Sequence, residues 1–432
     1  MEARRSPFPW IARTLMPREL WSNAMMAVAL GALEGGVVGM LVKTRFAEVA
    51  EPLWVNLAVA LVAGAPAFCN MASLAFSRMA EGGDKAVWVT SLKAVCALML
   101  VLLALAPVTA FGLVMVTITM IAARLAWAGA ITLRAVIWRA NFPRHVRARM
   151  TGRITVTYSL IIALAAGLIG AAMEIWPDAW RVLFPVAGLC GLAAAWRYRG
   201  VRIRHGGSLR RDEQRDRGTR GRSYLASSID ILVRDIWYRR YMLTMFIFGS
   251  GNLMVIALLV IILNEQFGFP RLHQVLVTTT LPLATLAVFT PIWARRLDAT
   301  HILDYRARQA WAFVLAVGLF VMASGLGMDW LFWVGALALG SAFAGGKLGW
   351  NLGHNDFAAD HSQSTLYMGI HVTLTGIRGL LAPLAGVLAY QWLESRHPGS
   401  GRWVLVFPFV LTLGGALTFV ALARRRRKEM IA

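Results

Sequence analysis

Ionisable and amide side chains interrupt an otherwise apolar sequence most densely between residues 345 and 386. Lys347 and Asn351 are four positions apart near the end of one apolar run, and His371 and Arg378 are seven apart in the next. On a helix, each of these pairs shares a face. A charged side chain at membrane depth costs about 2.5–3.5 kcal/mol on insertion scales, and such residues usually face a bundle interior or a water-filled cavity. These four residues are therefore candidates for binding a solute or carrying a proton.

Two of these candidates also have a structural interpretation. Arg378 could contact a substrate, or it could brace its half of the bundle through backbone carbonyls or Asp356, and we favour the brace. His371 could change charge near neutral pH. A lone buried histidine is more often a hydrogen-bonded structural group, and we favour that interpretation here.

No array of residues in the sequence has the spacing of an enzyme active site. Neither paired carboxylates nor a nucleophile beside a base occur at suitable spacing. One metal-like cluster is present, in a loop where such residues are usually solvated: His354, Asp356, Asp360 and His361. We therefore expect no catalytic activity, no cofactor and no metal.

The composition is that of a membrane protein. Of 432 residues, 58% are hydrophobic and only 15% are charged, and the apolar residues occur in runs long enough to span a bilayer as helices. The net charge of +22 would suggest nucleic acid in a soluble protein, but the Lys and Arg residues gather in alternate loops. This asymmetry predicts a multi-pass protein of a bacterial inner membrane with both termini cytoplasmic and no nucleic-acid partner. The three cysteines fall inside apolar runs and are expected to be small buried hydrophobes.

The apolar runs predict twelve transmembrane helices in two six-helix halves. We expect them near 20–42, 53–76, 86–106, 109–138, 153–174, 179–197, 241–263, 273–294, 307–326, 330–352, 366–390 and 403–423. Residues 1–19 suit a segment on the membrane surface. The domains are then an N-terminal half (1–198), a basic cytoplasmic linker with an amphipathic helix (199–240) and a C-terminal half (241–432). The fifth and eleventh helices share a Gly-framed Thr/Val pattern, from Gly152 and from Gly369, which indicates that the halves are pseudo-symmetric repeats.

The loop after the fourth expected helix reads NFPRHVRARMTG, with Pro143, a basic cluster and Gly152. Inside that helix Arg124 precedes Gly129. With twelve helices and a long basic connection after the sixth, the chain resembles the major facilitator superfamily of secondary transporters. The family's usual loop signatures after the second and eighth helices are degenerate here, and no motif fixes a subfamily.

The resemblance implies that helices 1, 4, 7 and 10 line a central cavity. Their polar residues would then form the site, together with the two candidates of helix 11: Glu34, Arg124, Trp127, Asn252, Lys347, Asn351, His371 and Arg378. Glu34 and Arg124 could form a pair that opens during transport, or a permanent structural ion pair. Arg124 and Trp127 share a face and could hold an anionic amphiphile, or Trp127 could simply pack on a neighbouring helix. Lys93 and Arg134 are expected to reach the cytoplasmic interface.

Together these features predict a symporter or antiporter that moves a small organic solute by alternating access. The excess of intramembrane cations favours an anionic or amphiphilic, even lipid-like, substrate with protons as the coupling ion. Membrane lipids are the expected surroundings, and a monomer is the expected state. The alternative is a membrane sensor or assembly partner on the same fold, docked through residues 199–240 to anionic lipid or a soluble protein.

Overall fold

The computed structural model describes residues 10–142, 144–216, 224–357 and 361–431, which form an all-α membrane protein. Within these ranges eleven helical spans are long and apolar enough to cross a membrane: Leu15–Arg45, Pro52–Met79, Lys85–Ala104, Ala110–Asn141, Arg153–Ile175, Ile236–Glu265, Arg271–Asp298, Ile302–Leu326, Trp330–Leu352, Leu366–Arg396 and Ser400–Glu429. The remaining expected helix, near 179–197, is present as α8 (Trp180–Tyr198). It carries Arg181 and Arg197 in its end turns and does not count among the eleven.

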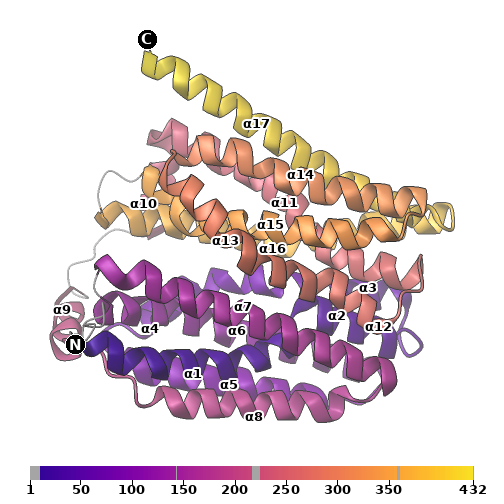
Figure 1. Cartoon of the computed structure of the whole chain (residues 1–432), viewed down its shortest axis with the longest axis horizontal. Helices are drawn as coiled ribbons and strands as arrows, with labels where there is room; N and C mark the ends of the chain where they lie inside the picture. The colour runs from indigo at the N-terminus through magenta and orange to yellow at the C-terminus, as the bar shows by residue number, and fades with distance from the viewer. Residues whose placement is uncertain (1–9, 143, 217–223, 358–360, 432) are drawn as a thin grey trace, which may run out of the picture.

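The helices form two layers, one from each half of the chain (Figure 1). The first contains α1 (Trp10–Ala32), α2 (Gly35–Arg45), α3 (Pro52–Phe68), η1 (Cys69–Ala72), α4 (Ser73–Met79), α5 (Lys85–Ala104), α6 (Ala110–Asn141), α7 (Arg144–Ile175) and α8. The second contains α11 (Ile236–Glu265), α12 (Arg271–Val275), η2 (Leu276–Thr280), α13 (Leu281–Asp298), α14 (Ile302–Leu326), α15 (Trp330–Leu352), η3 (Gly353–Asp356), α16 (His361–Arg396), η4 (Ser400–Leu405) and α17 (Val406–Ile431). Between the layers α3 packs on α16, α2 on α11, and α7 on α12 and α13.

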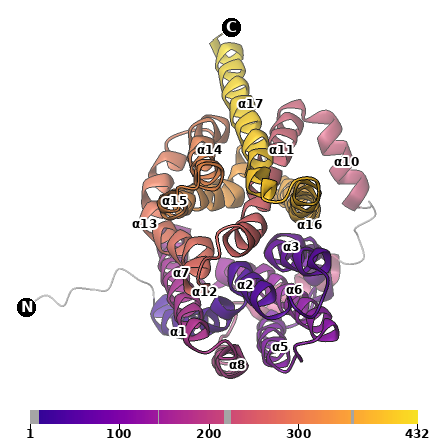
Figure 2. The same ribbon diagram turned by 90° about the vertical axis from the view of Figure 1, so that its right-hand side faces the viewer.

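The connection between the halves contains two short helices that attach to different layers. α9 (Gly206–Asp216) is fixed to the first half, because Lys85 Nζ lies 2.5 Å from Glu213 Oε2 and Arg210 pairs with Asp84. α10 (Tyr224–Arg234) packs on α11 and α16 of the second half. We call the end of the bundle that carries α9 and α10 the linker end and the opposite end, which faces the viewer in Figure 2, the far end.

Several of the described membrane-spanning segments depart from regular α-helix, and two of these departures lie against each other. The helix expected at 20–42 begins earlier, at Trp10, and breaks at Leu33 and Glu34. Glu34 is extended there, with φ −66° and ψ 140°. The glycines on either side, Gly31 and Gly35, weaken the helix locally because glycine is among the poorest helix formers. In the second half, η2 is a turn of π-helix between α12 and α13.

Candidate functional site

The break between α1 and α2 is held by Arg124 of α6. A helix end leaves its last carbonyls without intrahelical donors, and here the carbonyl of Leu33 accepts hydrogen bonds from Arg124 Nε, at 3.1 Å, and from Nη2. Nη2 also lies 3.1 Å from Glu34 Oε1. Arg124 is 5% exposed, whereas the Glu34 side chain is 24% exposed. The buried cation is therefore compensated by a carboxylate and by the negative end of α1.

A cavity of about 180 Å³ lies beside this break, between the two halves. Its polar lining comes from Glu34, Asn252, Thr278 and Thr279, and its apolar lining includes Ala63, Pro66, Leu253, Ile256, Pro282, Leu283 and Phe343. Irregular backbone at membrane depth is tolerated where it is buried in protein or lines a cavity, and single π-turns often occur at functional sites. Two of the irregular segments, the α1–α2 break and η2, meet at this cavity.

The two irregular segments touch directly at Gly36. A Cβ atom on Gly36 would lie 2.3 Å from the hydroxyl oxygens of both Thr278 and Thr279, so only glycine fits there without movement. Across the cavity, Thr412 Oγ1 donates to Asn252 Oδ1 at 3.2 Å, which leaves the amide nitrogen of Asn252 for another partner. The cavity thus offers a carboxylate, an amide and two hydroxyls within a largely apolar wall.

Lys347 and Trp127 flank this region. Lys347 of α15 is exposed and lies one helical turn after Phe343 of the cavity wall, on the same face of the helix. Trp127 is buried and stacks on Tyr158 of α7, with ring centroids 6.2 Å apart. Trp127 therefore packs on a neighbouring helix, as the structural interpretation expects.

The other predicted site residues lie outside the cavity. Asn351 is exposed in the last turn of α15. Arg378 is buried in α16, where it donates to the carbonyl of Met245 in α11 and, at 3.0 Å, to Thr375 Oγ1. These contacts agree with a brace between α11 and α16. The carbonyl partner of Arg378 is that of Met245. Asp356, the other expected partner, accepts instead from the amide of Ile302 at the start of α14, at 2.6 Å.

His371 is fully buried, 5.7 Å from the ring of Trp350 and 6.3 Å from that of Tyr241. Neither of its ring nitrogens has a hydrogen-bond partner among the described residues. The hydrogen bonds expected of a structural histidine are therefore missing, and aromatic packing surrounds the ring instead. Of the metal-like cluster, Asp360 lies outside the described residues, and the described part of the chain contains no group of three metal-type side chains.

Sequence reasoning misplaced two basic residues of the first half. Lys93 and Arg134 were expected to reach the membrane interface, but Lys93 is fully buried and Arg134 is 9% exposed. Lys93 Nζ donates to Ser22 Oγ at 2.7 Å, and Arg134 donates to Asn23 Oδ1. Sequence reasoning also misplaced Glu19, since it assigned residues 1–19 to the membrane surface. Glu19 is 1% exposed in α1, where it accepts from Asn23 and Tyr198.

A second network that the sequence did not reveal joins the two halves at the far end. Lys43 of α2 donates to Glu265 of α11 and, at 2.7 Å, to Asn56 of α3. Asn56 also donates to Glu265 at 3.2 Å, and Glu265 accepts from Tyr390 of α16 at 2.5 Å. Lys43 is 4% exposed, so this is an interior contact rather than a surface pair. Lys43 lies one helix, α2, beyond Glu34, and the network closes the space between the halves on that side of the cavity.

Close backbone packing also joins α3 and α16, at the depth of the cavity. A Cβ atom on Gly64 would lie 2.4 Å from the carbonyl oxygen of Gly379, and one on Gly379 would lie 2.5 Å from the Cβ of Ala67. Small residues let membrane helices approach this closely.

No known family model matches the sequence, and no curated protein matches it. Solved structures do. A D-xylose–proton symporter aligns with a TM-score of 0.69 at 14% identity over 94% of this chain and 97% of its own. The nucleoside transporter NupG gives 0.67 at 10% identity over 94% and 98%. A bacterial homologue of the human lysosomal transporter Spinster gives 0.65 at 13% identity over 97% and 98%. This chain therefore has the fold of the major facilitator superfamily transporters.

Proposed function

We propose that this protein is a secondary active transporter, and that its solute site is the cavity at the α1–α2 break. One observation carries the proposal: a carboxylate–arginine pair holds a broken membrane helix open onto a cavity that both halves line. Alternating access needs a site near mid-membrane between two halves that can rock about it. The transporters with similar structures support the same interpretation, since their named substrates are xylose and nucleosides.

Glu34 is the proposed proton carrier. When ionised, it shares Arg124 with the carbonyl of Leu33. Protonation would neutralise Glu34 and remove its attraction for the guanidinium, which would then be held by the carbonyl alone. Because Glu34 is the N-terminal flanking residue of α2, loosening this pair would free α2 to move relative to α6. Proton binding would thereby be coupled to the movement that exposes the cavity.

The proposed solute is small and has an apolar body with an anionic end. The cavity wall is mostly apolar, and Lys347, one helical turn after Phe343 of that wall, adds positive charge beside it. An uncharged, hydroxylated solute is the second candidate, because Asn252, Thr278 and Thr279 supply neutral hydrogen-bonding groups. We further propose that α8 is the twelfth membrane helix, that the basic linker end is cytoplasmic in an inner membrane, and that the protein works as a monomer.

Transport in proteoliposomes tests the function and the role of Glu34 together. A panel of organic anions, sugars, nucleosides and lipid-like amphiphiles would be offered with and without an imposed pH gradient. We expect at least one solute to accumulate with the gradient. In Glu34→Gln, which mimics the protonated state, gradient-driven accumulation should be lost while exchange of solute across the membrane continues.

Glu48→Gln is the matched control, since Glu48 is an exposed carboxylate away from the cavity. It should transport as the wild type does. If Glu34→Gln accumulated solute at the wild-type rate, Glu34 would not be the proton carrier. If the wild-type protein moved no member of the panel under any gradient, the sensor or assembly alternative would replace the transport proposal.

A further inference from the structure

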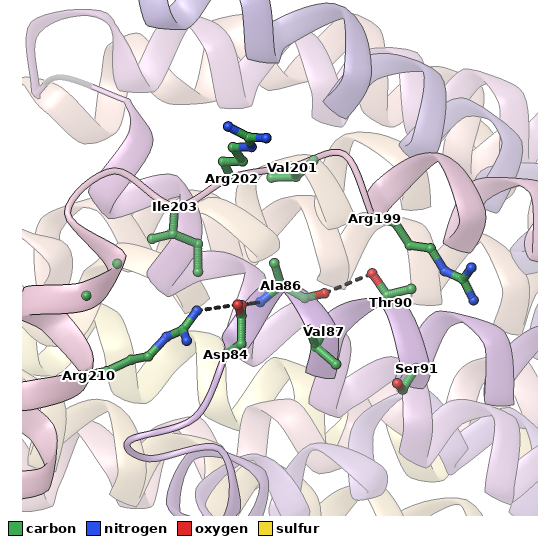
Figure 3. A pocket seen from close by; sticks show the side chains of 12 residues that line it. Asp84, Ala86, Val87, Thr90, Ser91, Arg199, Val201, Arg202, Ile203 and Arg210 are labelled. Atoms are coloured by element: carbon green, nitrogen blue, oxygen red, sulfur yellow. Dashed lines mark hydrogen bonds and ion pairs between the residues drawn. The ribbon is translucent and has the colours of Figure 1, made fainter.

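A second cavity lies outside the proposed transport site, at the linker end of the first half. It measures about 550 Å³ and lies between the start of α5 and the segment that joins α8 to α9. Figure 3 shows its labelled walls, among them Asp84, Thr90, Ser91, Arg199, Arg202 and Arg210. A volume of this size matches ordinary small-ligand pockets.

The charge of this cavity is positive. Three arginines line it, against the single carboxylate of Asp84, which is already paired with Arg210. Arg199 and Arg202 are exposed and have no carboxylate partner among the described residues. Arginine is well suited to phosphate because its planar fork can donate two parallel hydrogen bonds.

Backbone geometry adds donors to the same wall. His205 has a φ of 54°, a left-handed conformation that is rare for a residue other than glycine, and it turns the chain directly into α9. Gly206 and Gly207, in the first turn of this 11-residue helix, line the cavity. The Gly206 amide already donates to the carbonyl of Ile203 at 3.1 Å, which leaves the Gly207 amide as the donor for a ligand. The amides of a helix's first turn have no intrahelical acceptor, and the positive end of the helix favours an anion.

The wall that carries these donors is fixed to the first half. Asn141 of α6 donates to the carbonyl of Arg202 at 2.9 Å and accepts from the amide of Arg204 at 2.8 Å. Arg18 of α1 donates to the carbonyl of Gly200 at 2.5 Å. The site is therefore held by side chains from two membrane helices and is more than an exposed basic loop.

The cavity continues into an apolar surface that faces outward. Val87 and Ser91 line the cavity and also begin an exposed row on α5 that continues through Val95, Leu98 and Leu102. α5 and α8 lie side by side at the outer face of the first layer in both views (Figures 1 and 2). α8 carries its own exposed row of apolar side chains: Val182, Val186, Leu189 and Trp196. A positive pocket next to an exposed apolar surface matches the two parts of a phospholipid.

We propose that this cavity binds the headgroup phosphate of an anionic phospholipid, whose acyl chains lie along the outer faces of α5 and α8. The excess of two unpaired arginines selects a headgroup with net negative charge over a zwitterionic one. The boundary between the polar pocket and the apolar surface is formed by Thr90 and the exposed Ser91. The Thr90 hydroxyl donates to the carbonyl of Ala86 at 2.8 Å.

Native mass spectrometry of the purified protein, exchanged into mixtures of phosphatidylglycerol and phosphatidylcholine, tests this site. The wild type should retain phosphatidylglycerol in preference to phosphatidylcholine. In the double variant Arg199→Gln/Arg202→Gln, phosphatidylglycerol should be retained roughly 30-fold less tightly, because each basic residue near an anionic surface contributes about 1 kcal/mol and 1.4 kcal/mol corresponds to tenfold. The control Arg295→Gln/Arg308→Gln removes two exposed arginines of the second half and should leave retention unchanged.

A second variant distinguishes loss of the binding site from misfolding of the protein. A Cβ atom on Gly207 would meet nothing within 4 Å, so Gly207→Asp should fold while placing a carboxylate in the pocket, and it should also lose the lipid. The proposal is overturned if both variants retain phosphatidylglycerol as the wild type does, or if phosphatidylcholine is retained equally well. It is also overturned if millimolar inorganic phosphate alone displaces the lipid, since the pocket would then be a site for free phosphate. None of these measurements depends on transport.

Discussion

Arg124 and Arg378 are both buried guanidinium groups, but their surroundings give them different roles. Arg124 forms an ion pair with Glu34, a carboxylate that lines a cavity. Arg378 has carbonyl and hydroxyl partners from α11 and α16 and lies over Gly249, where a Cβ atom would be 2.4 Å from its Nη1. A charge whose partner can be protonated can change state during a transport cycle. A charge held by carbonyls is a fixed brace.

This difference predicts opposite effects for two substitutions of basic residues. Arg378→Gln should lower the free energy of unfolding by about 1–3 kcal/mol, because it leaves buried partners unsatisfied and a gap over Gly249. Lys347→Gln should leave stability unchanged, since Lys347 is exposed, and should instead weaken transport of anionic solutes. Thermal unfolding in detergent and uptake in proteoliposomes would be measured for both. A stable Arg378→Gln protein with altered substrate preference would contradict the brace.

At the level of elements, the amphipathic and apolar patterns located the membrane helices but not their irregularities. A run of apolar residues such as 20–42 has the same mean hydropathy whether its helix is continuous or broken at Glu34. Gly31 and Gly35 indicate weakness there, but the break depends on Arg124, which is 90 positions away in the sequence. The π-turn of η2 is similarly fixed by contact with Gly36 of the other half.

The same limit explains the misplaced cations. Residue spacing shows that Lys93 and Arg134 lie near a helix end, where long side chains commonly reach the interface. It cannot show that Glu19 is buried beside them, because that depends on how α1, α5, α6 and α8 pack. The pair of Glu34 with Arg124 could be suggested from the sequence because both residues fall near mid-helix in segments that the family resemblance brings together.

The start of α14 supplies a prediction about pH. His301 precedes the helix, and its Nδ1 accepts from the amide of Leu303 at 3.2 Å, which requires a neutral ring. Burial, and then the charge of Arg426, lower the pKa of His301, while Asp356 and Asp304 oppose the shift. The unfolded chain therefore binds a proton more readily than the folded one. Stability should fall as the pH drops below about 6.5, the ordinary value for histidine.

His301→Asn separates this effect from general acid sensitivity. Asparagine can still accept at the start of the helix but does not titrate. The decrease in unfolding midpoint between pH 7.5 and pH 5.5 should be smaller in His301→Asn than in the wild type. Some acid sensitivity should persist, because burial also lowers the pKa of His354. An unchanged decrease in the variant would show that His301 does not contribute.

At the scale of the whole molecule, one hydrogen-bond network joins the two halves at the far end. Lys43, Asn56, Glu265 and Tyr390 join the layers at the far end. The two described helices of the connection belong to different halves, α9 to the first and α10 to the second. In this arrangement, which we call closed, the far-end network holds the halves together, and transport would require this network to separate so that the cavity opens to that side.

The far-end network should therefore control how often the cavity opens there. Glu265→Gln leaves Lys43 buried without a carboxylate, which disfavours the closed arrangement. The closed state should be destabilised by about 1 kcal/mol or more, which corresponds to roughly fivefold more of the far-end-open state. The measurement uses a background in which Cys69, Cys96 and Cys190 are replaced by alanine. In that background, Thr279→Cys places a thiol in the cavity wall. Its rate of reaction with a membrane-impermeant maleimide added to whole cells reports how often the cavity opens.

Asp178→Asn provides the control for this measurement. Asp178 pairs with Arg45 at 2.7 Å, also at the far end, but both residues belong to the first half. Removing that pair should leave the rate of labelling unchanged, whereas Glu265→Gln should raise it about fivefold. Equal rates in the two variants would mean that the loss of any far-end charge loosens the bundle. Because Glu265 joins the two layers and Asp178 does not, a rise confined to Glu265→Gln would instead identify movement between the halves as the event that admits the reagent.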